Sequence, residues 1–239
     1  MRLRVAAFCI AAASVVLPSM ANADSIAIVI NSGATTETAL FPGIPGTANG
    51  IVSTPAAGPG SIPNWTVNQV TGSVSSSPAG VNFGSTSLDV SSNSVQSTLN
   101  VYVTAYDLNA PLGNLGFLSS FTSNTLPAGW SVTEQTWLST ANGIGTSGLG
   151  TLLGSTTFGA IGTLQQFLAA NVITGPYSLT EQYTITTPVG GCTGVNCSAQ
   201  STINVAAAPG PILGAGLPGL LAACGGLIAM ARRRRRNLT

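Results

Sequence analysis

The chain has 239 residues, of which 44% are hydrophobic and only 5% are charged, and its formal net charge is +1 at pH 7. No lysine, arginine or histidine lies between Arg4 and Arg232, whereas every acidic residue lies there. This central stretch cannot clamp a phosphate with a guanidinium or activate a nucleophile with a histidine. The composition therefore excludes most enzyme mechanisms and nearly all nucleic-acid binding.

Residues 1–23 have the layout of a secretory signal peptide. Arg2 and Arg4 precede an apolar run that ends at Pro18, and Ala21 and Ala23 supply small residues for a cleavage site. We therefore expect export and cleavage before Asp24. The alternative, an uncleaved membrane helix, is disfavoured because the apolar run is short.

Residues 209–236 form a second targeting segment with three parts. Pro209, Gly210 and Pro211 break the chain, and residues 212–231 are apolar and uncharged. The segment closes with Arg232, Arg233, Arg234, Arg235 and Arg236. At about 1.5 Å per residue, a helix over 212–231 would reach about the thickness of a bilayer core. The arginines should stay in the cytoplasm, which leaves the body outside the inner membrane.

This order of proline motif, apolar helix and arginine cluster resembles the PEP-CTERM sorting signal of Gram-negative bacteria. The resemblance covers about residues 208 to 236. The family's usual Val-Pro-Glu-Pro is Ala208-Pro209-Gly210-Pro211 here, closer to a variant with the pattern Pro-x-Pro-x-x-Gly-Ala-Gly-Leu-Pro-Gly-Leu. The resemblance implies that a membrane transpeptidase, an exosortase, cuts near the prolines and passes the protein to the cell surface. The alternative is an ordinary tail-anchored envelope protein.

The body between these segments has the alternating pattern of β-strands. Leu99, Val101, Val103 and Ala105 face one side of such a strand, and polar or aromatic residues face the other. The same pattern occurs in Ser25–Ile30, Trp65–Val70, Ser87–Val90, Trp130–Ser139, Tyr177–Thr187 and Ser201–Ala206. Strands separated by Gly, Pro, Asn and Ser predict a mainly β domain over residues 65–208, an antiparallel sandwich or barrel. A solenoid is disfavoured because no repeat period appears.

Three segments depart from this pattern. Residues 163–170 (TLQQFLAA) predict a short helix that begins at Thr163. Asn31 to Asn64 contains five prolines, so we expect residues 24–64 to hold one strand and a long Pro/Gly-rich loop. Asn142 to Gly150 is rich in glycine and predicts turns, because it lacks the strand-to-helix context of a nucleotide site.

Cys192 and Cys197 lie in a turn-rich stretch between two predicted strands. In an oxidising compartment this spacing predicts a disulfide. Two cysteines without a histidine cannot form a closed zinc site, and we expect neither a metal nor a cofactor. Asp107 and Asn109 could offer two oxygens to calcium, but a pair of this kind is more typical of a loop cap.

Two similar segments, residues 131–138 (SVTEQTWL) and 178–185 (SLTEQYTI), place Glu134 and Glu181 in matching contexts. One hypothesis makes these residues the acid and base of a glycosidase. The simpler interpretation is two equivalent strands of one sheet. Because the body holds no cation to pair with a buried carboxylate, we expect both glutamates to be at least partly exposed.

Trp65, Trp130 and Trp137 could belong to the core or to a face that stacks on sugar rings. Taken together, the sequence predicts an exported, non-catalytic structural or adhesive protein of the envelope or extracellular matrix. The alternatives are a module that binds exopolysaccharide and, more distantly, a glycoside hydrolase. The expected partners are the inner membrane, a sorting transpeptidase and exopolysaccharide, without nucleic acid.

Overall fold

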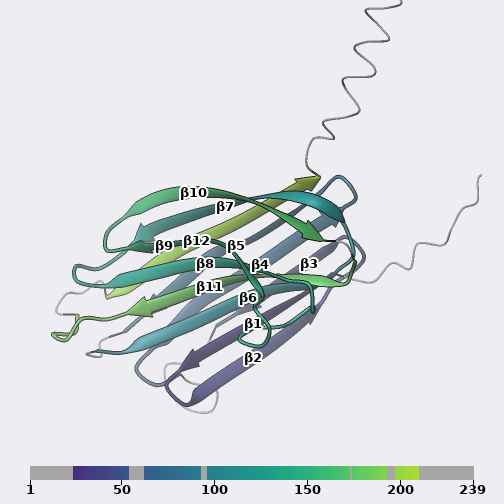
Figure 1. Ribbon diagram of the computed structural model, residues 1–239. Helices are drawn as coiled ribbons and strands as arrows, with labels where there is room; N and C mark the ends of the chain where they lie inside the picture. The colour runs from purple at the N-terminus through teal and green to yellow at the C-terminus, as the bar shows by residue number, and fades with distance from the viewer. Residues whose placement is uncertain (1–23, 54–61, 93–95, 173, 193–196, 210–239) are drawn as a thin grey trace, which may run out of the picture.

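The computed structural model describes residues 24–53, 62–92, 96–172, 174–192 and 197–209. These residues form twelve β-strands in two six-stranded antiparallel sheets, and no part of them is helical (Figure 1). The predicted antiparallel two-sheet architecture is confirmed. None of the described residues forms a helix that is long and apolar enough to cross a membrane. The predicted signal peptide, the apolar segment 212–231 and the arginine cluster lie outside the described residues.

Sheet A has the strand order β2-β1-β6-β11-β8-β9. Its strands are β1 (Ser25–Ser32), β2 (Thr35–Pro42), β6 (Thr98–Leu108), β8 (Ser131–Ser139), β9 (Thr151–Phe158) and β11 (Tyr177–Thr186). The segments with the two similar motifs, β8 and β11, are direct neighbours in this sheet. Their similarity in sequence therefore corresponds to equivalent places in one sheet.

Sheet B has the strand order β10-β7-β12-β5-β4-β3. Its strands are β3 (Thr47–Val52), β4 (Thr66–Ser77), β5 (Gly80–Ser91), β7 (Gly113–Thr125), β10 (Gly162–Val172) and β12 (Ser198–Pro209). Successive side chains of a strand point to opposite faces, so every second residue of each strand can enter the space between the sheets. That space holds a continuous apolar core, to which β1 contributes Ile26, Ile28 and Ile30 and β7 contributes Phe117 and Phe121.

The predicted loop over residues 31–64 is wrong for the part that forms β2 and β3. Pro42 is the last residue of β2, and Gly46, with φ +82°, turns the chain into β3. β2 and β3 are the outermost strands of their sheets, where proline is tolerated because one side of the strand needs no ladder hydrogen bonds. Residues 54–61 of the predicted loop lie outside the described residues.

The predicted helix over residues 163–170 is also wrong, because this segment belongs to β10. β10 pairs with β7 from Gly162 to Val172 without a break. The Gln166 side chain donates to the Ser155 carbonyl (2.9 Å) and accepts from the Ser155 N–H (2.8 Å). Tertiary pairing thus overrides the helical propensity of the Leu, Gln and Ala residues, which is a weak preference.

The Cys192–Cys197 disulfide is present, with 5.7 Å between the two Cα atoms.

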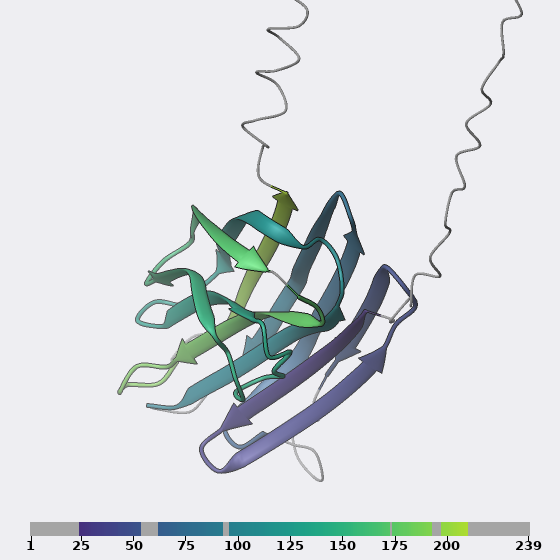
Figure 2. The ribbon, with the colours of Figure 1, turned by 45° about the vertical axis from the view of Figure 1, so that its right-hand side comes forward.

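Both ends of the described chain lie at one end of the sandwich (Figure 2). Ser76 at the end of β4 donates to Asp24 (2.5 Å), and the neighbouring Ser77 hydroxyl donates to the carbonyl of Gly80 (3.3 Å). Gly80 in turn lies against the Ala207 carbonyl, near the end of β12.

Candidate functional site

A polar cluster lies inside the sandwich, where sheet A faces sheet B. Glu134 on β8 and Glu181 on β11 are both 0% exposed, so the prediction of partial exposure is wrong. The register sets Glu134 opposite Tyr183 and Glu181 opposite Thr136. The two carboxyl groups are therefore diagonal neighbours on the inward face of adjacent strands.

Irregularities in sheet B provide hydrogen bonds for this cluster. The Ser85 N–H donates to Glu181 (2.8 Å), where the register of β5 with β12 shifts. The Thr122 N–H donates to Glu134 (3.1 Å), and the Ile203 N–H donates to the Tyr183 hydroxyl (2.9 Å). A bulge removes N–H groups from the strand ladder, so sheet B can turn backbone donors toward the polar side chains of sheet A.

The Ser85 hydroxyl completes the link between the sheets through its hydrogen bond with the Tyr183 hydroxyl. Ser119 of β7 and Thr136 of β8 join in the same way, at 2.7 Å. One carboxyl oxygen of each glutamate, Oε1, lacks a hydrogen bond among the described residues. The cluster is therefore incompletely satisfied, which favours the protonated form of a buried carboxyl group.

Burial raises the pKa of Glu134 to about 7, against the opposing effect of the hydrogen bond from the Thr122 N–H. Burial also raises the pKa of Glu181 well above its usual range, and the charge of Glu134 adds to that rise. No lysine, arginine or histidine lies in residues 5–231 to offset either effect. Both shifts favour the protonated forms of the two groups.

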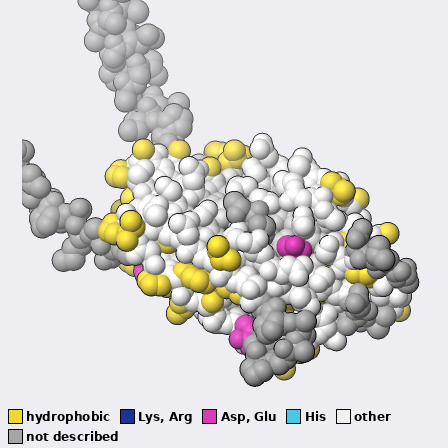
Figure 3. All heavy atoms as spheres, turned by 180° about the vertical axis from the view of Figure 1, so that it is seen from behind, with side chains coloured by type: hydrophobic (Ala, Val, Ile, Leu, Met, Phe, Trp, Pro, Cys, Tyr) yellow, Lys and Arg dark blue, Asp and Glu magenta, His cyan; other side chains and the backbone are white. Residues whose placement is uncertain are grey.

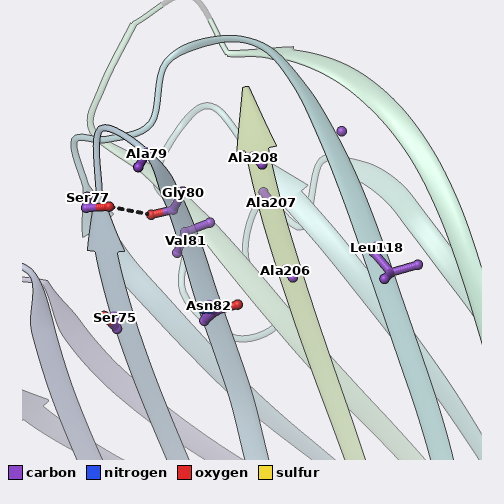
Figure 4. A pocket seen from close by; sticks show the side chains of 11 residues that line it. Ser75, Ser77, Ala79, Gly80, Val81, Asn82, Leu118, Ala206, Ala207 and Ala208 are labelled. Carbon is purple, nitrogen blue, oxygen red and sulfur yellow. Dashed lines mark hydrogen bonds between the residues drawn. The ribbon is translucent and has the colours of Figure 1, made fainter. Parts of the chain in front are cut away.

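A shallow groove crosses the outer face of sheet B over β5 and β12, opposite the inward face that donates to the glutamates. Figure 4 shows the side chains that line its larger part. Its two adjoining parts have cavity volumes of about 450 and 250 Å³ and share Asn82, Leu118 and Ala206. The remaining lining consists of small or hydroxyl-bearing residues, Asn204 and three further apolar residues: Ser73, Ser75, Ser77, Ala79, Gly80, Val81, Phe83, Gly84, Gly116, Ser120, Asn204, Val205, Ala207 and Ala208. No charged side chain lines either part.

Two glycines shape this groove. A Cβ atom on Gly84 would lie 2.3 Å from Oδ1 of Asn204, so the glycine allows the amide to lie flat across β5. A Cβ atom on Gly116 would lie 2.8 Å from the Phe167 ring, so Phe167 of β10 packs over this glycine. Phe167 is nevertheless 68% exposed.

The outer face of sheet A is a ladder of hydroxyl and amide groups. The Thr184 hydroxyl donates to Asn100 (2.8 Å), and the indole N–H of Trp137 donates to Gln182 (3.1 Å). Trp137 is half-buried on this face. Among the described residues this face carries no contiguous row of exposed tryptophan and tyrosine, since Tyr102 is only 7% exposed.

The other two tryptophans belong to the core. Trp65 and Trp130 are buried and pack edge to face, with 5.6 Å between ring centroids.

Asp107 holds a loop in place, since Asn142 donates to its carboxylate (2.7 Å) and accepts from its N–H (2.9 Å). The described residues contain no cluster of His, Cys, Asp or Glu that could hold a metal ion.

Asn82 and Asn204, the amides of the groove, were not predicted as site residues from the sequence. The sequence did contain a sign of their outward orientation, because Asn82 and Asn204 each interrupt an apolar run as an outward-facing strand residue would.

Figure 3 shows one broad face of the molecule, where the described surface is mostly uncharged, with scattered hydrophobic and a few acidic side chains. Pro209 of the predicted sorting motif is the last described residue of β12.

No protein-family model matches the chain, and a search of curated proteins finds no match. Among solved structures, the infectious bursal disease virus Gx strain is 12% identical, with a TM-score of 0.34, and covers 90% of this chain and 56% of its own. The enzymatically active domain of the bacteriophage CBA120 tailspike protein 4 is 15% identical, with a TM-score of 0.28 and coverage of 61% and 19%. The mannan-recognising module TmCBM27 is 10% identical, with a TM-score of 0.26 and coverage of 67% and 99%. Similarities of this size carry no argument about function.

Proposed function

We propose that the chain is an exported, non-catalytic structural or adhesive protein of the cell envelope or extracellular matrix, and that its sandwich holds a neutral polysaccharide in the groove of sheet B. The groove itself carries this proposal. It combines the amides of Asn82 and Asn204, several hydroxyl groups and the exposed side chain of Leu118. A neutral sugar chain offers hydroxyl groups to such amides and apolar ring faces to such a side chain.

The charge distribution favours a neutral ligand over an anionic one. The groove lining has no charged side chain, and residues 5–231 hold no lysine, arginine or histidine. An anionic polysaccharide or a phosphate would find no cation there and would be repelled by the acidic residues of the body. The ligand class is therefore an uncharged glycan, such as a neutral exopolysaccharide.

The burial of Glu134 and Glu181 supports a non-catalytic role. A glycosidase places its two carboxyl groups on either side of the bond that it cleaves, in a cleft open to the substrate. Here both groups are 0% exposed and hydrogen-bond to the backbone of the opposite sheet. A sugar chain in the groove lies on the other side of sheet B and has no contact with them.

The proposed route to the surface uses both targeting segments. Residues 1–23 direct export, and residues 209–236 hold the protein at the inner membrane until a sorting transpeptidase cuts near Pro209. The fold is compatible with such a tether, because Asp24 and Pro209 lie at the same end of the sandwich. The opposite end, which includes the Cys192–Cys197 disulfide, would point away from the membrane.

The test uses residues 24–209, which contain all twelve strands of both sheets. Affinity electrophoresis through neutral glucan or mannan should retard the protein, and electrophoresis through anionic alginate should not. Replacing Asn82 and Asn204 together by alanine should weaken the binding about thirtyfold, at about 1 kcal/mol for each of the two hydrogen bonds. Asn100→Ala, which removes an amide from sheet A, is the matched control and should bind normally.

Three outcomes would overturn parts of this proposal. Migration that no neutral polysaccharide changes would refute the binding function and leave a structural one. Equal weakening by Asn100→Ala would move the binding face to sheet A. Release of reducing ends from any of the polysaccharides would show that the protein is an enzyme.

A further inference from the structure

The two sheets have four outermost strands, and three of them are protected against pairing with another chain. β2 carries Glu37 and ends in Pro42, and β3 has only six residues. β9 is covered at Ser155, because the Gln166 side chain hydrogen-bonds to both the backbone N–H and the backbone carbonyl of this residue. Charge, proline, short length and side-chain cover are the usual means by which a protein blocks its sheet edges.

β10 lacks every one of these protections. It has 11 residues, contains neither a charged residue nor a proline, and pairs on one side only, with β7. Figure 1 shows β10 at the outer margin of the sandwich. Its other side therefore presents unpaired backbone N–H and carbonyl groups along a strand that is longer than an average one.

Apolar side chains surround this edge on both faces. Phe167 is 68% exposed on the outer face, and Leu164 and Leu168, on the inner face, are 40% and 37% exposed. Ile161, just before the strand, is 70% exposed. Phe167 is fixed over Gly116, so it presents its ring without a further loss of side-chain freedom. A partner strand would gain backbone hydrogen bonds and cover these groups together.

The charge pattern indicates which partner fits. β7, β9, β10 and β12, the strands around this edge, contain no charged residue. A cationic protein would be attracted to the acidic residues elsewhere on the body and not to this neutral edge. A second copy of the chain can approach here without the repulsion that its acidic surface would cause at other places.

We propose that β10 is a self-association edge, at which two copies of the chain pair β10 with β10 in antiparallel orientation. A two-fold axis through the middle of the strand brings the same surface of both copies together and continues the antiparallel pattern of sheet B. The dimer contains one continuous sheet across both copies. This pairing uses the edge of sheet B and leaves the groove over β5 and β12 open.

Sedimentation velocity of residues 24–209 over a range of concentrations tests the proposal. The wild type should form a dimer, and Phe167→Lys should raise its dissociation constant at least about tenfold, because it sets like charges on both copies near one axis. Leu40→Lys, at a similarly exposed apolar residue of β2 (57%), is the matched control and should dimerise normally. A wild type that stays monomeric to about 1 mM would overturn the proposal. So would a dimer that Phe167→Lys leaves intact.

Cysteine cross-linking tests the orientation, since Cys192 and Cys197 are joined and residues 24–209 contain no other cysteine. Single cysteines are placed at the five outward positions of β10, Thr163, Gln165, Phe167, Ala169 and Asn171. In an antiparallel pair only residues near the axis meet their own copies, so disulfide dimers should be abundant at a middle position and scarce at both ends. Equal cross-linking at all five positions would indicate parallel pairing and contradict the proposal, as would cross-linking at none.

Discussion

The buried carboxyl pair should make this protein more stable in acid than at neutral pH, the reverse of the usual behaviour. Burial raises the pKa of Glu134 from 4.5 to about 7. A raised pKa means that folding favours the protonated form. The stabilising contribution is complete below pH 4.5, where Glu134 is protonated in both states, and is lost as the pH rises through 7. The loss is about 3 kcal/mol, at 1.36 kcal/mol for each of about 2.5 pH units.

Glu181 should extend this loss to higher pH, because its pKa is raised further and ionised Glu134 adds to the rise. The pKa of Asp24 is also raised, chiefly by burial, so its contribution has the same sign. The free energy of unfolding should therefore fall between pH 4.5 and 8, by at least the contribution of Glu134.

Urea denaturation at several pH values, followed by the fluorescence of the buried Trp65 and Trp130, measures this slope. Glu134→Gln should flatten the curve and unfold at higher urea concentration than the wild type at pH 8. Asn100→Ala, which changes no ionisable group, is the control and should keep the wild-type slope. A stability that is constant or rises from pH 4.5 to 8 would refute the argument, as would a Glu134→Gln variant with an unchanged slope.

Three further predictions follow from the sequence and the fold. Trypsin should leave residues 5–232 as one fragment even in denaturant, because no lysine or arginine lies between Arg4 and Arg232; internal tryptic fragments would contradict this. Cys192→Ser should lower the free energy of unfolding by about 2 kcal/mol, because the unfolded chain regains the conformational entropy of a short closed loop. An unchanged urea midpoint would show that the disulfide does not stabilise the fold. If sorting occurs at Pro209, the intact mass of protein from the cell surface should lack residues 212–239, whereas a surface form that retains the arginines would leave simple anchoring.

The strands that the sequence predicted are those with a clear apolar alternation. Leu99–Ala105 lies in β6, and Trp130–Ser139 and Tyr177–Thr187 correspond to β8 and β11. β7 escaped prediction because its inward positions include Ser119 and Ser123, which break the apolar period. β10 was misassigned because propensity is weak compared with the pairing that β7 provides, and β7 is remote in sequence.

The groove could not be predicted, because it depends on which strands are neighbours. Asn82 and Asn204 are more than a hundred residues apart in the chain, yet they lie on β5 and β12, which pair directly. Alternation indicates that each amide faces outward, but only the strand order shows that they share one face. The same limit applies to Phe167, whose position over Gly116 follows from the pairing of β10 with β7.

The burial of Glu134 and Glu181 shows where the reasoning from charge was incomplete. Without a cation in the body, a buried ionised carboxylate is too costly, and exposure was one way to avoid that cost. The structure uses another: each carboxyl group accepts a hydrogen bond from a backbone N–H of sheet B, and burial raises the pKa of both. This solution needs the Ser85 and Thr122 N–H groups to point toward the glutamates. A sequence pattern does not show this, since the register shift at Ser85 depends on the pairing of two distant strands. Because both glutamates are buried between the sheets, the stability of the two-sheet packing depends on whether they are protonated. The pH dependence of the free energy of unfolding measures that dependence directly.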